Sequence, residues 1–389
     1  MFDRFVRNIL NGQQIIHKIR HVQTVRLMFL HQYIKNECPA VLSLGARMAS
    51  TSSNRPIQRS KLLNDYRTNR IGANLQLTDL GDHVLEFALD PRGSRFIEQK
   101  LGHANPTETA HLMDALRGNV LTLSKNLYGS HVIQKALESI TSLSCHECGS
   151  RVIECVLEHC TEQQKRPALE QLNDNVLTLA TDQHGNFVIQ HLIKHGLPED
   201  RERIVRSLHE KVTSLSIHEY GNRVIECVLE HCTEQQKRPM LEQLHGNVLS
   251  LVTDPYGCFV IQHVIEHGLL EDRERIVRSL QGDIMKNGHL NSFCNVVNKC
   301  LIFGTMEQKN VLIDEVCTDN GFGHPPLLEM MKHPFGNTVV QKMLHVADSA
   351  RRNKMMFAIK TAQLKTREID HRNRLTPFKN VSKGAANNG

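Results

Sequence analysis

Apolar and polar positions follow one another along the chain in a recurring unit with helical spacing. One unit begins with a short apolar segment, NVLTLATD at 175–182, and continues after a glycine with NFVIQHLIKHG at 186–196. The stretch that follows, PEDRERIVRSL at 198–208, carries a proline and acidic residues in its first turn, where both favour the start of a helix. Alternation typical of strands persists nowhere. The pattern therefore predicts an all-α protein with two helices per unit.

The unit is repeated along the chain. GSRVIECVLEHCTEQQKRP at 149–167 returns almost unchanged at 221–239, and about 48 of 60 positions are identical between 149–208 and 221–280. The glycines before the first helix show that this length of 72 residues is two units of 36. Because one unit cannot bury its apolar face alone, we expect neighbouring units to stack into a solenoid. The series is Gly93, Gly129, Gly149, Gly185, Gly221 and Gly257, continued by Phe293 and Gly336.

Three polar letters of the first helix vary between units, whereas its apolar letters hardly change. On a wheel of about 100° per residue, the apolar letters of 222–232 face the core. Asn222, Arg223 and Glu226 share the opposite arc. These three positions form the trio of a unit, and they are its first, second and third letters. Letters on a solvated face are free to drift, which is one interpretation of this variation. Against it, the third letter is Gln or Glu in seven of the eight units.

Several phrases resemble the Pumilio (PUF) family of RNA-binding proteins. They include GSRFIEQKL, GNFVIQH, GCFVIQHVIEHG, LIDEVC followed by FGNTVVQKML, and RSKLLNDYRTNRIGANLQL before the first unit. The resemblance covers about residues 57–350. It implies a right-handed α-solenoid of about eight 36-residue Pumilio-type helical repeats, one of them truncated, with no cofactor and no enzymatic activity.

In that family each repeat reads one base of single-stranded RNA by two or three side chains. Two residues four apart contact the Watson–Crick edge of the base, and the residue after the first stacks between bases. Carried over to this chain, the resemblance implies the following RNA-binding residues, from the first unit to the eighth: Ser94, Arg95, Glu98; Ser130, His131, Gln134; Ser150, Arg151, Glu154; Asn186, Phe187, Gln190; Asn222, Arg223, Glu226; Cys258, Phe259, Gln262; Cys294, Asn295, Asn298; Asn337, Thr338, Gln341.

The edge pairs imply a target sequence. A Glu carboxylate only accepts hydrogen bonds, which suits the N–H donors of guanine, whereas a Gln amide both donates and accepts. Units one and three then resemble guanine readers, two and six adenine readers, and four and eight uracil readers. Unit five mixes two codes and receives no base, and unit seven departs from the Ser and Glu of the family. With the last repeat at the 5′ end, the expected target is 5′-U-n-A-n-U-G-A-G-3′.

The step from Gly129 to Gly149 is 16 residues shorter than the regular step. TSLSCHECGSR follows QKALESI directly, so the second helix of unit two is missing. We expect exposed apolar surface or a cavity-like defect at this place. A kink there would divide the RNA surface into a two-repeat and a six-repeat part; a deletion or an incorrect gene model is the alternative.

Charge divides the chain into three parts. Residues 1–70 carry a net charge of +9, residues 351–389 carry +8, and the middle carries −11. The basic excess thus lies at the ends, and RNA binding by the middle would depend on local geometry, with bases facing the protein and phosphates outward. We expect a leader at 1–55, a Pumilio homology domain at 56–350 and a basic diverged segment at 351–389 that lacks the closing helical pattern.

The leader is open to two interpretations, a disordered segment or a mitochondrial presequence, since it is rich in Arg and poor in acids. No run of about 18 apolar residues predicts a membrane span. The eleven cysteines show no framework spacing, which favours free thiols in a reducing compartment.

CHEC at 145–148 has the spacing of half a zinc site, but the other copy reads IHEY at 217–220. We therefore interpret both cysteines as core residues and predict no metal. Likewise the pairs His159/Cys160 and His231/Cys232 read as structural helix ends, and Thr161 with Gln164 predicts a capping box.

Two functions from different classes remain. The first is a cytoplasmic protein that binds mRNA 3′ untranslated regions and, through repressor or deadenylase-recruiting proteins on its outer surface, lowers translation or message stability. HPPLLEM at 324–330 lies where loops for such partners occur. The second is a helical-repeat protein scaffold with a degenerate RNA face. Gln and Glu at the third letter favour RNA, whereas Cys294, Asn298, Thr338 and the missing helix favour the scaffold.

Overall fold

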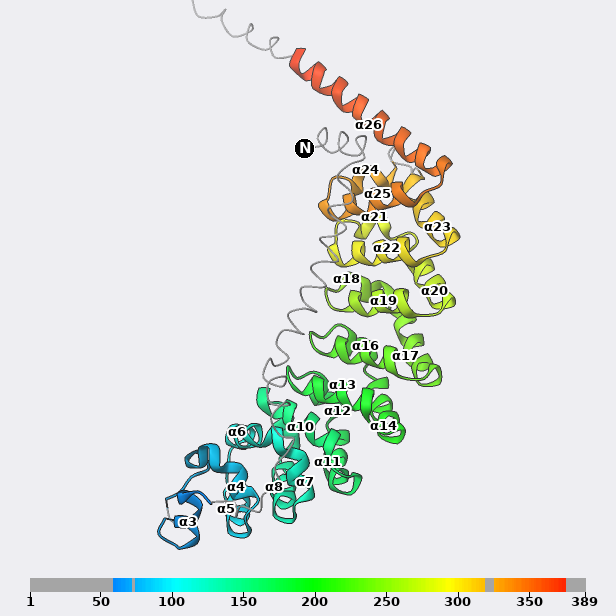
Figure 1. Ribbon diagram of the computed structural model, residues 1–389. Coiled ribbons are helices and arrows are strands. Elements are labelled where there is room, and N and C mark those ends of the chain that lie inside the picture. The colour runs from blue at the N-terminus through cyan, green and yellow to red at the C-terminus, as the bar shows by residue number, and fades with distance from the viewer. Residues whose placement is uncertain (1–58, 72–73, 319–324, 376–389) are drawn as a thin grey trace, which may run out of the picture. The chain divides into compact units, whose positions relative to one another are not determined.

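A computed structural model of the chain describes residues 59–71, 74–318 and 325–375. The described helices from α3 (Lys61–Arg67) onward belong to one compact unit. Over these residues the chain forms helices and turns and no strand (Figure 1). None of the described helices is long and apolar enough to cross a membrane.

Each repeat except unit two contains three helices, because the short apolar segment before the glycine is itself helical. All of these short helices but one pack against the first helix of their own repeat; α21 packs instead against α23 and α24. They are α4 (Val84–Ala88), α7 (Val120–Lys125), α9 (Ile140–Ser144), α12 (Val176–Ala180), α15 (Val212–Ser216), α18 (Val248–Thr253), α21 (Ile284–Asn287) and α24 (Pro326–Met330).

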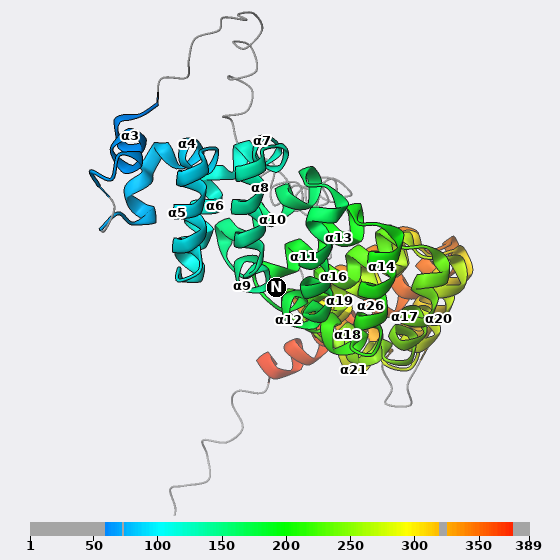
Figure 2. The ribbon, with the colours of Figure 1, turned by 90° about the horizontal axis from the view of Figure 1, so that it is seen from below.

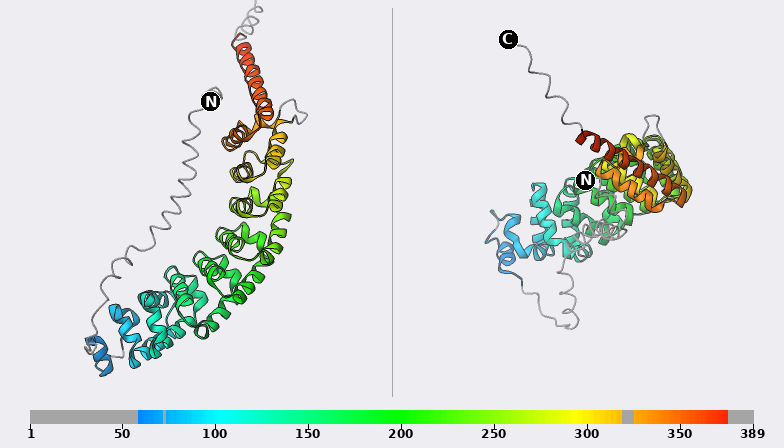
Figure 3. Two further views of the ribbon diagram at one scale, coloured as in Figure 1. Left: turned by 45° about the vertical axis from the view of Figure 1, so that its right-hand side comes forward. Right: turned by 90° about the horizontal axis from the view of Figure 1, so that it is seen from above.

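The first helices carry the predicted RNA-binding letters and pack side by side along most of the solenoid (Figure 3). In unit five Val224, Ile225 and Val228 are fully buried, so the predicted core face is confirmed. The first helices are α5 (Pro91–Leu101), α8 (Leu127–Leu137), α10 (Glu147–His159), α13 (Gly185–His195), α16 (Gly221–His231), α19 (Gly257–His267), α22 (Asn291–Phe303) and α25 (Pro334–Val346).

From α11 onward each second helix packs against the next one, and the starts of the second helices are set by local sequence. The predicted capping box of Thr161 is confirmed: its backbone N–H donates to Gln164 Oε1 at 2.9 Å, and its hydroxyl accepts from the Gln164 N–H. The second helices are α6 (Pro106–Leu116), α11 (Glu162–Asp174), α14 (Pro198–His209), α17 (Glu234–Gly246), α20 (Leu270–Leu280), α23 (Met306–Cys317) and α26 (Ser349–Leu375).

The repeated glycine is required by the close approach of the short helix to the first helix. A Cβ on Gly221 would lie 2.7 Å from the Leu215 carbonyl oxygen, and one on Gly149 would lie 2.0 Å from the Leu143 oxygen. No ordinary side-chain contact is that short. The glycine that marks the repeat in the sequence is therefore a packing residue.

The described helices confirm that unit two has no second helix, because α8 is followed directly by the short helix α9. The expected defect does not form. α10, the first helix of unit three, packs extensively against α6, the second helix of unit one (Figure 2). Val152, Ile153 and Val156 of α10 are buried, as is Met113 of α6. α10 therefore fills the place of the missing helix, and the expectation of exposed apolar surface or a cavity is wrong.

Both ends of the repeat array are covered. At the N-terminal end Tyr66 of α3 lies 5.7 Å from Phe87 and 5.2 Å from Phe96, measured between ring centroids. At the other end α26 packs against α23, α24 and α25 and buries Met355 and Ile359. Our expectation that the closing helical pattern is lacking is wrong for the described part, since α26 continues to Leu375.

The segment 324–330 is not a loop over its described part. Pro326–Met330 form α24, in which Pro326, Leu327 and Met330 are buried, so the expectation of a loop is wrong for these residues, and partner binding there stays a prediction. The leader 1–55 lies outside the described residues.

Candidate nucleic-acid interface

The second letters of the predicted trios are exposed along the row of first helices. Phe187 is 38% exposed and Phe259 43%, which is unusual for rings this large and leaves their faces open. Among the eight second letters, Asn295 alone is half-buried. The exposed seven are Arg95, His131, Arg151, Phe187, Arg223, Phe259 and Thr338. Arg, His and Phe offer flat surfaces on which bases stack, whereas Thr338 does not.

Successive second letters approach each other across the boundary between units. The guanidinium carbon of Arg223 lies 5.9 Å from the centroid of the Phe259 ring, within the range of a cation–π contact. Arg223 also forms an ion pair of 3.3 Å with Glu226, the third letter of its own trio. A base that stacks between Arg223 and Phe259 would therefore replace the cation–π contact between these two side chains.

The first letters differ from the prediction of the wheel, because most of them are buried and not on the exposed arc. Ser130 and Asn337 are half-buried, whereas the other six, Ser94, Ser150, Asn186, Asn222, Cys258 and Cys294, are only 2–3% exposed. The reason is their place in the first turn of the helix beside the short helix, where their donors bond to carbonyls of the preceding residues. The Ser150 hydroxyl donates to Glu147 O at 3.2 Å, and the Cys258 thiol donates to Pro255 O at 3.5 Å.

The third letters lie at the border between core and solvent. Gln134 is exposed and the others, Glu98, Glu154, Gln190, Glu226, Gln262, Asn298 and Gln341, are half-buried. In unit four the Gln190 amide donates to Asn186 Oδ1 at 2.9 Å, so the first and third letters contact each other as the spacing of four predicts. The trios of units four to six are therefore assembled locally, each from one helix.

Three buried side-chain oxygens at trio positions have no hydrogen-bond partner. They are the Oδ1 atoms of Asn222, Asn298 and Asn337. A buried acceptor left without a donor costs about 1–3 kcal/mol. Such atoms are candidates for ligand contacts. They could not be predicted from the sequence, because the orientation of an amide is decided by its neighbours.

The row of first helices is interrupted between units two and three. α5 packs against α8, and α13, α16, α19, α22 and α25 follow one another in pairwise contact. α10 contacts α13, but it packs against α6 far more than against α8. The trios of α5 and α8 are thus separated from the continuous row of units three to eight. This arrangement agrees with the prediction that the row of first helices is divided into a two-repeat and a six-repeat part.

The other motifs have structural surroundings. Cys145 and Cys148 are half-buried, so our interpretation of both as core residues is only partly right. Burial, followed by the nearby Asp182 carboxylate, raises the pKa of Cys145 to about 11. Within the described ranges no group of three or more His, Cys, Asp and Glu side chains lies together as a metal site would require. His159 and His231 end α10 and α16 as predicted, each followed by a buried cysteine.

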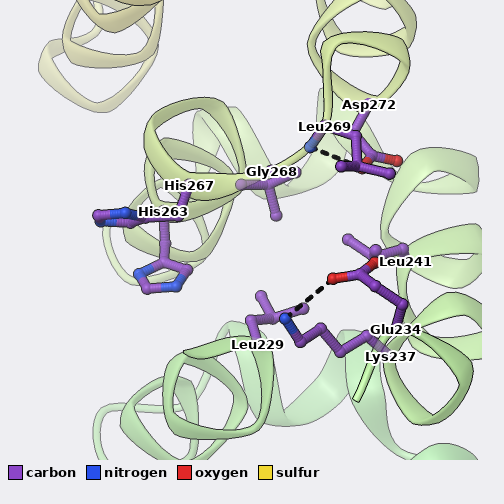
Figure 4. Close-up of a pocket in the computed structure, with 10 residues that line it drawn as sticks. Leu229, Glu234, Lys237, Leu241, His263, His267, Gly268, Leu269 and Asp272 are labelled. Atoms are coloured by element: carbon purple, nitrogen blue, oxygen red, sulfur yellow. Dashed lines mark hydrogen bonds and ion pairs between the residues drawn. The ribbon is translucent and has the colours of Figure 1, made fainter. Parts of the chain in front are cut away.

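A small pocket lies between units five and six, away from the trios (Figure 4). Lys237 reaches Glu234 at 3.1 Å, and the buried Asp272 accepts from the Leu269 N–H at 3.2 Å. His263 and His267 line the opposite wall. Lys237 and Glu234 pair with each other, whereas Asp272 is bound by Arg238 and His245.

Comparison with known families identifies the repeats. The family model described as "Pumilio-family RNA binding repeat" matches residues 139–172, 175–209, 211–245, 247–280, 294–317 and 327–359. A second model, "NOP9-like PUF repeat domain", matches residues 82–142. The change from one model to the other thus coincides with the truncated repeat.

Curated relatives match over short stretches. Pumilio homolog 1 of Xenopus laevis is 38% identical in an alignment of 126 residues that covers 28% of this chain and 10% of that protein. Pumilio homolog 2 of the same organism is 57% identical over 53 residues, 14% of this chain and 4% of the relative. The matches span a tenth or less of the length of these relatives.

Solved structures match over most of the chain. PUF-8 in complex with PBE-RNA is 30% identical with a TM-score of 0.56, covering 77% of this chain and 93% of that one. The Puf3 RNA-binding domain bound to site A of the Cox17 RNA 3′ UTR recognition sequence is 28% identical with a TM-score of 0.53, covering 79% and 96%.

Proposed function

Since the chain belongs to the Pumilio family of RNA-binding repeat proteins, we propose that it binds single-stranded RNA by sequence, one base per repeat. The observation that carries this proposal is the recurrence, in six of the eight first helices, of an exposed side chain flanked by two half-buried or buried residues at the first and third positions. A base stacks on the exposed letter and turns its Watson–Crick edge to the other two.

The charge distribution fits bases that face the protein. Residues 71–350 carry a net charge of −11, which repels a phosphate backbone laid against them. Stacking contributes about 1–3 kcal/mol per base and does not depend on charge. Phosphates that point outward would avoid the acidic solenoid, and the basic residues at the two ends of the chain favour association at a distance.

The biological consequence is part of the same proposal. The Puf3 domain was solved on a 3′ UTR sequence, and we extend this ligand class to the present chain. Binding to an mRNA 3′ UTR in the cytoplasm would lower translation or message stability through proteins held on the outer row of second helices. This action needs no catalytic group and no cofactor.

A scaffold for other proteins, with an unused RNA face, is the second candidate. Specific observations favour it in units seven and eight. The Cys294 thiol is buried and donates to Gly288 O at 3.3 Å, and the Thr338 hydroxyl donates to Phe335 O at 2.6 Å. Neither side chain offers a free donor to a base. The displaced α10 adds to this picture, since it interrupts the row.

Selection of a random RNA pool on the full-length protein, followed by sequencing, tests the proposal. We expect enrichment of a motif that begins with U, has A in third place and continues with U-G in fifth and sixth place. A folded, helical protein that enriches no sequence would contradict RNA readout and leave the scaffold.

A further inference from the structure

We propose that unit five, through Asn222 and Glu226, reads guanine. This inference rests on the proposed RNA binding and assigns a base to a pair of letters that mixes two patterns. The observation behind it is that the two side chains present hydrogen-bond acceptors and no donor.

The Asn222 amide has already used its donors. Its Nδ2 donates to His218 O at 2.6 Å and to Glu219 O at 2.9 Å, so both N–H groups are bound to the turn that precedes the helix. Its Oδ1 is buried and has no partner. These two bonds fix the amide with its oxygen as the only group left for a ligand.

Glu226 supplies the second acceptor. Its carboxylate forms an ion pair of 3.3 Å with Arg223. A carboxylate has no proton to donate. Asn222 and Glu226 are four residues apart on one helical face and therefore meet the same base.

Only guanine carries two donors side by side on its Watson–Crick edge, N1–H and N2–H. Uracil has one donor between two carbonyl acceptors, and adenine and cytosine each place a donor beside a ring acceptor. Two protein acceptors facing any of these three bases would oppose an acceptor, which leaves polar groups unpaired at a cost. Guanine alone satisfies both protein oxygens.

Unit four shows what a single change at the third letter does. Asn186 makes the same two bonds through Nδ2, to Asp182 O and Gln183 O at 2.8 Å each. There the Gln190 amide donates to Asn186 Oδ1 at 2.9 Å, so the Asn oxygen is satisfied. Glu226 cannot make this bond. The two units differ by the amide donor of Gln190, which Glu226 lacks. The pair in unit five therefore presents only hydrogen-bond acceptors to a base.

The Asn222 oxygen is buried, and the neighbouring Arg223 contacts both Glu226 and Phe259. A base inserted between Arg223 and Phe259 separates these side chains and brings its edge toward the pair. The donor that it delivers removes the penalty of the unpartnered acceptor.

The test uses full-length protein and four RNAs, 5′-UUAXUGAG-3′, in which X is G, A, C or U; a second set varies only the fifth base. We expect the RNA with G to bind about tenfold more tightly than each of the others, the discrimination of one good bidentate base contact. Equal affinity for all four, with discrimination kept at the fifth base, would overturn the inference and leave the proposed function intact. Loss of discrimination at every position would overturn both.

A reciprocal pair of variants provides the control. Glu226→Gln restores a donor beside Asn222 and should move the preference at X from G to U. Gln190→Glu should move the preference at the fifth base from U to G while X stays G. Circular dichroism checks that each variant is folded, and the wild-type comparison stands even where a variant is not. An unchanged preference in both folded variants would contradict the inference.

Discussion

At the residue scale, the glycine that begins a first helix is fixed by the carbonyl it touches. Gly221→Ala would place a Cβ 2.7 Å from Leu215 O, so the short helix and α16 must move apart. We expect a loss of about 1–3 kcal/mol in the free energy of unfolding, the usual cost of overpacking. Gly246→Ala in α17 is the control, because its Cβ would meet nothing within 4 Å. Urea unfolding of both variants should show a lower midpoint for the first alone.

The exposed ring of Phe187 allows binding to be separated from stability. Phe187→Ala removes a stacking surface that is 38% exposed, and we expect RNA affinity to fall by about 1–3 kcal/mol, or about 5- to 150-fold. Leu197→Ala, at a side chain that is 40% exposed outside the trios, should leave the affinity unchanged. Equal losses in the two variants, measured by fluorescence anisotropy, would argue against stacking at Phe187.

At the element scale, the 72-residue duplication supplies matched positions whose surroundings differ. Asp272 at the start of α20 is 1% exposed and is bound by Arg238 at 2.9 Å and by His245 at 3.0 Å. In the other copy Asp200 is bound by Arg166 at 3.1 Å. Asn173 stands where the second copy has His245, and its side chain has no hydrogen-bond partner. The joint between α17 and α20 is thus better satisfied than that between α11 and α14.

We therefore expect Asp272→Asn to lower the free energy of unfolding by about 2 kcal/mol, the scale of a lost charged hydrogen bond. Asp200→Asn should cost less, since one of its partners is already missing. Denaturant unfolding of the two variants checks the order. A larger loss for Asp200→Asn would contradict the role given to His245.

The same carboxylate predicts a dependence on pH. Burial by itself raises the pKa of Asp272, but hydrogen bonds from His245, Arg238 and the Leu269 N–H outweigh it, and the net pKa is lowered. Its stabilisation is present in full above the unfolded pKa of about 3.9 and is lost as the pH falls through the lower folded value. The difference in stability between wild type and Asp272→Asn should therefore shrink as the pH falls below about 4.

At the scale of the whole molecule, the packing of α10 against α6 divides the reading surface. Units three to eight form a continuous row, whereas α5 and α8 lie outside it. The repeat model also begins to match at residue 139, at the same division. We expect the RNA motif selected by the full-length protein to be six bases long, as read by units three to eight.

Restoring the missing helix should lengthen this motif. A copy of residues 160–175 inserted between Ser139 and Ile140 adds 16 residues and returns the step from Gly129 to the next repeated glycine to 36 residues. The inserted helix would take the place beside α6, and α10 would pack beside α8. Selection on this variant should give a motif of eight bases that ends in A-G. A motif of unchanged length would show that units one and two do not read RNA.

Much of this protein follows from local sequence. The helical class, the period of 36 and the core face of α16 follow from the spacing of apolar letters, because burial repeats with the turn of the helix. The capping box at Thr161 was predictable for a related reason, since both partners lie within four residues. The trios could be located from the sequence because each lies on a single helix.

The remaining features were decided by contacts between distant segments. The sequence shows that a second helix is missing, but only the tertiary structure shows that α10 takes its place. Packing of α10 against α6 removes the apolar surface of both helices from water. The burial of the first letters depends on the short helix beside them. The base expected at unit five depends on which carbonyls hold the Asn222 amide and on the absence of a donor at Glu226. The sequence thus determined the positions of the trio residues on the first helices, and the tertiary structure decided which of their donor and acceptor atoms are left for a base.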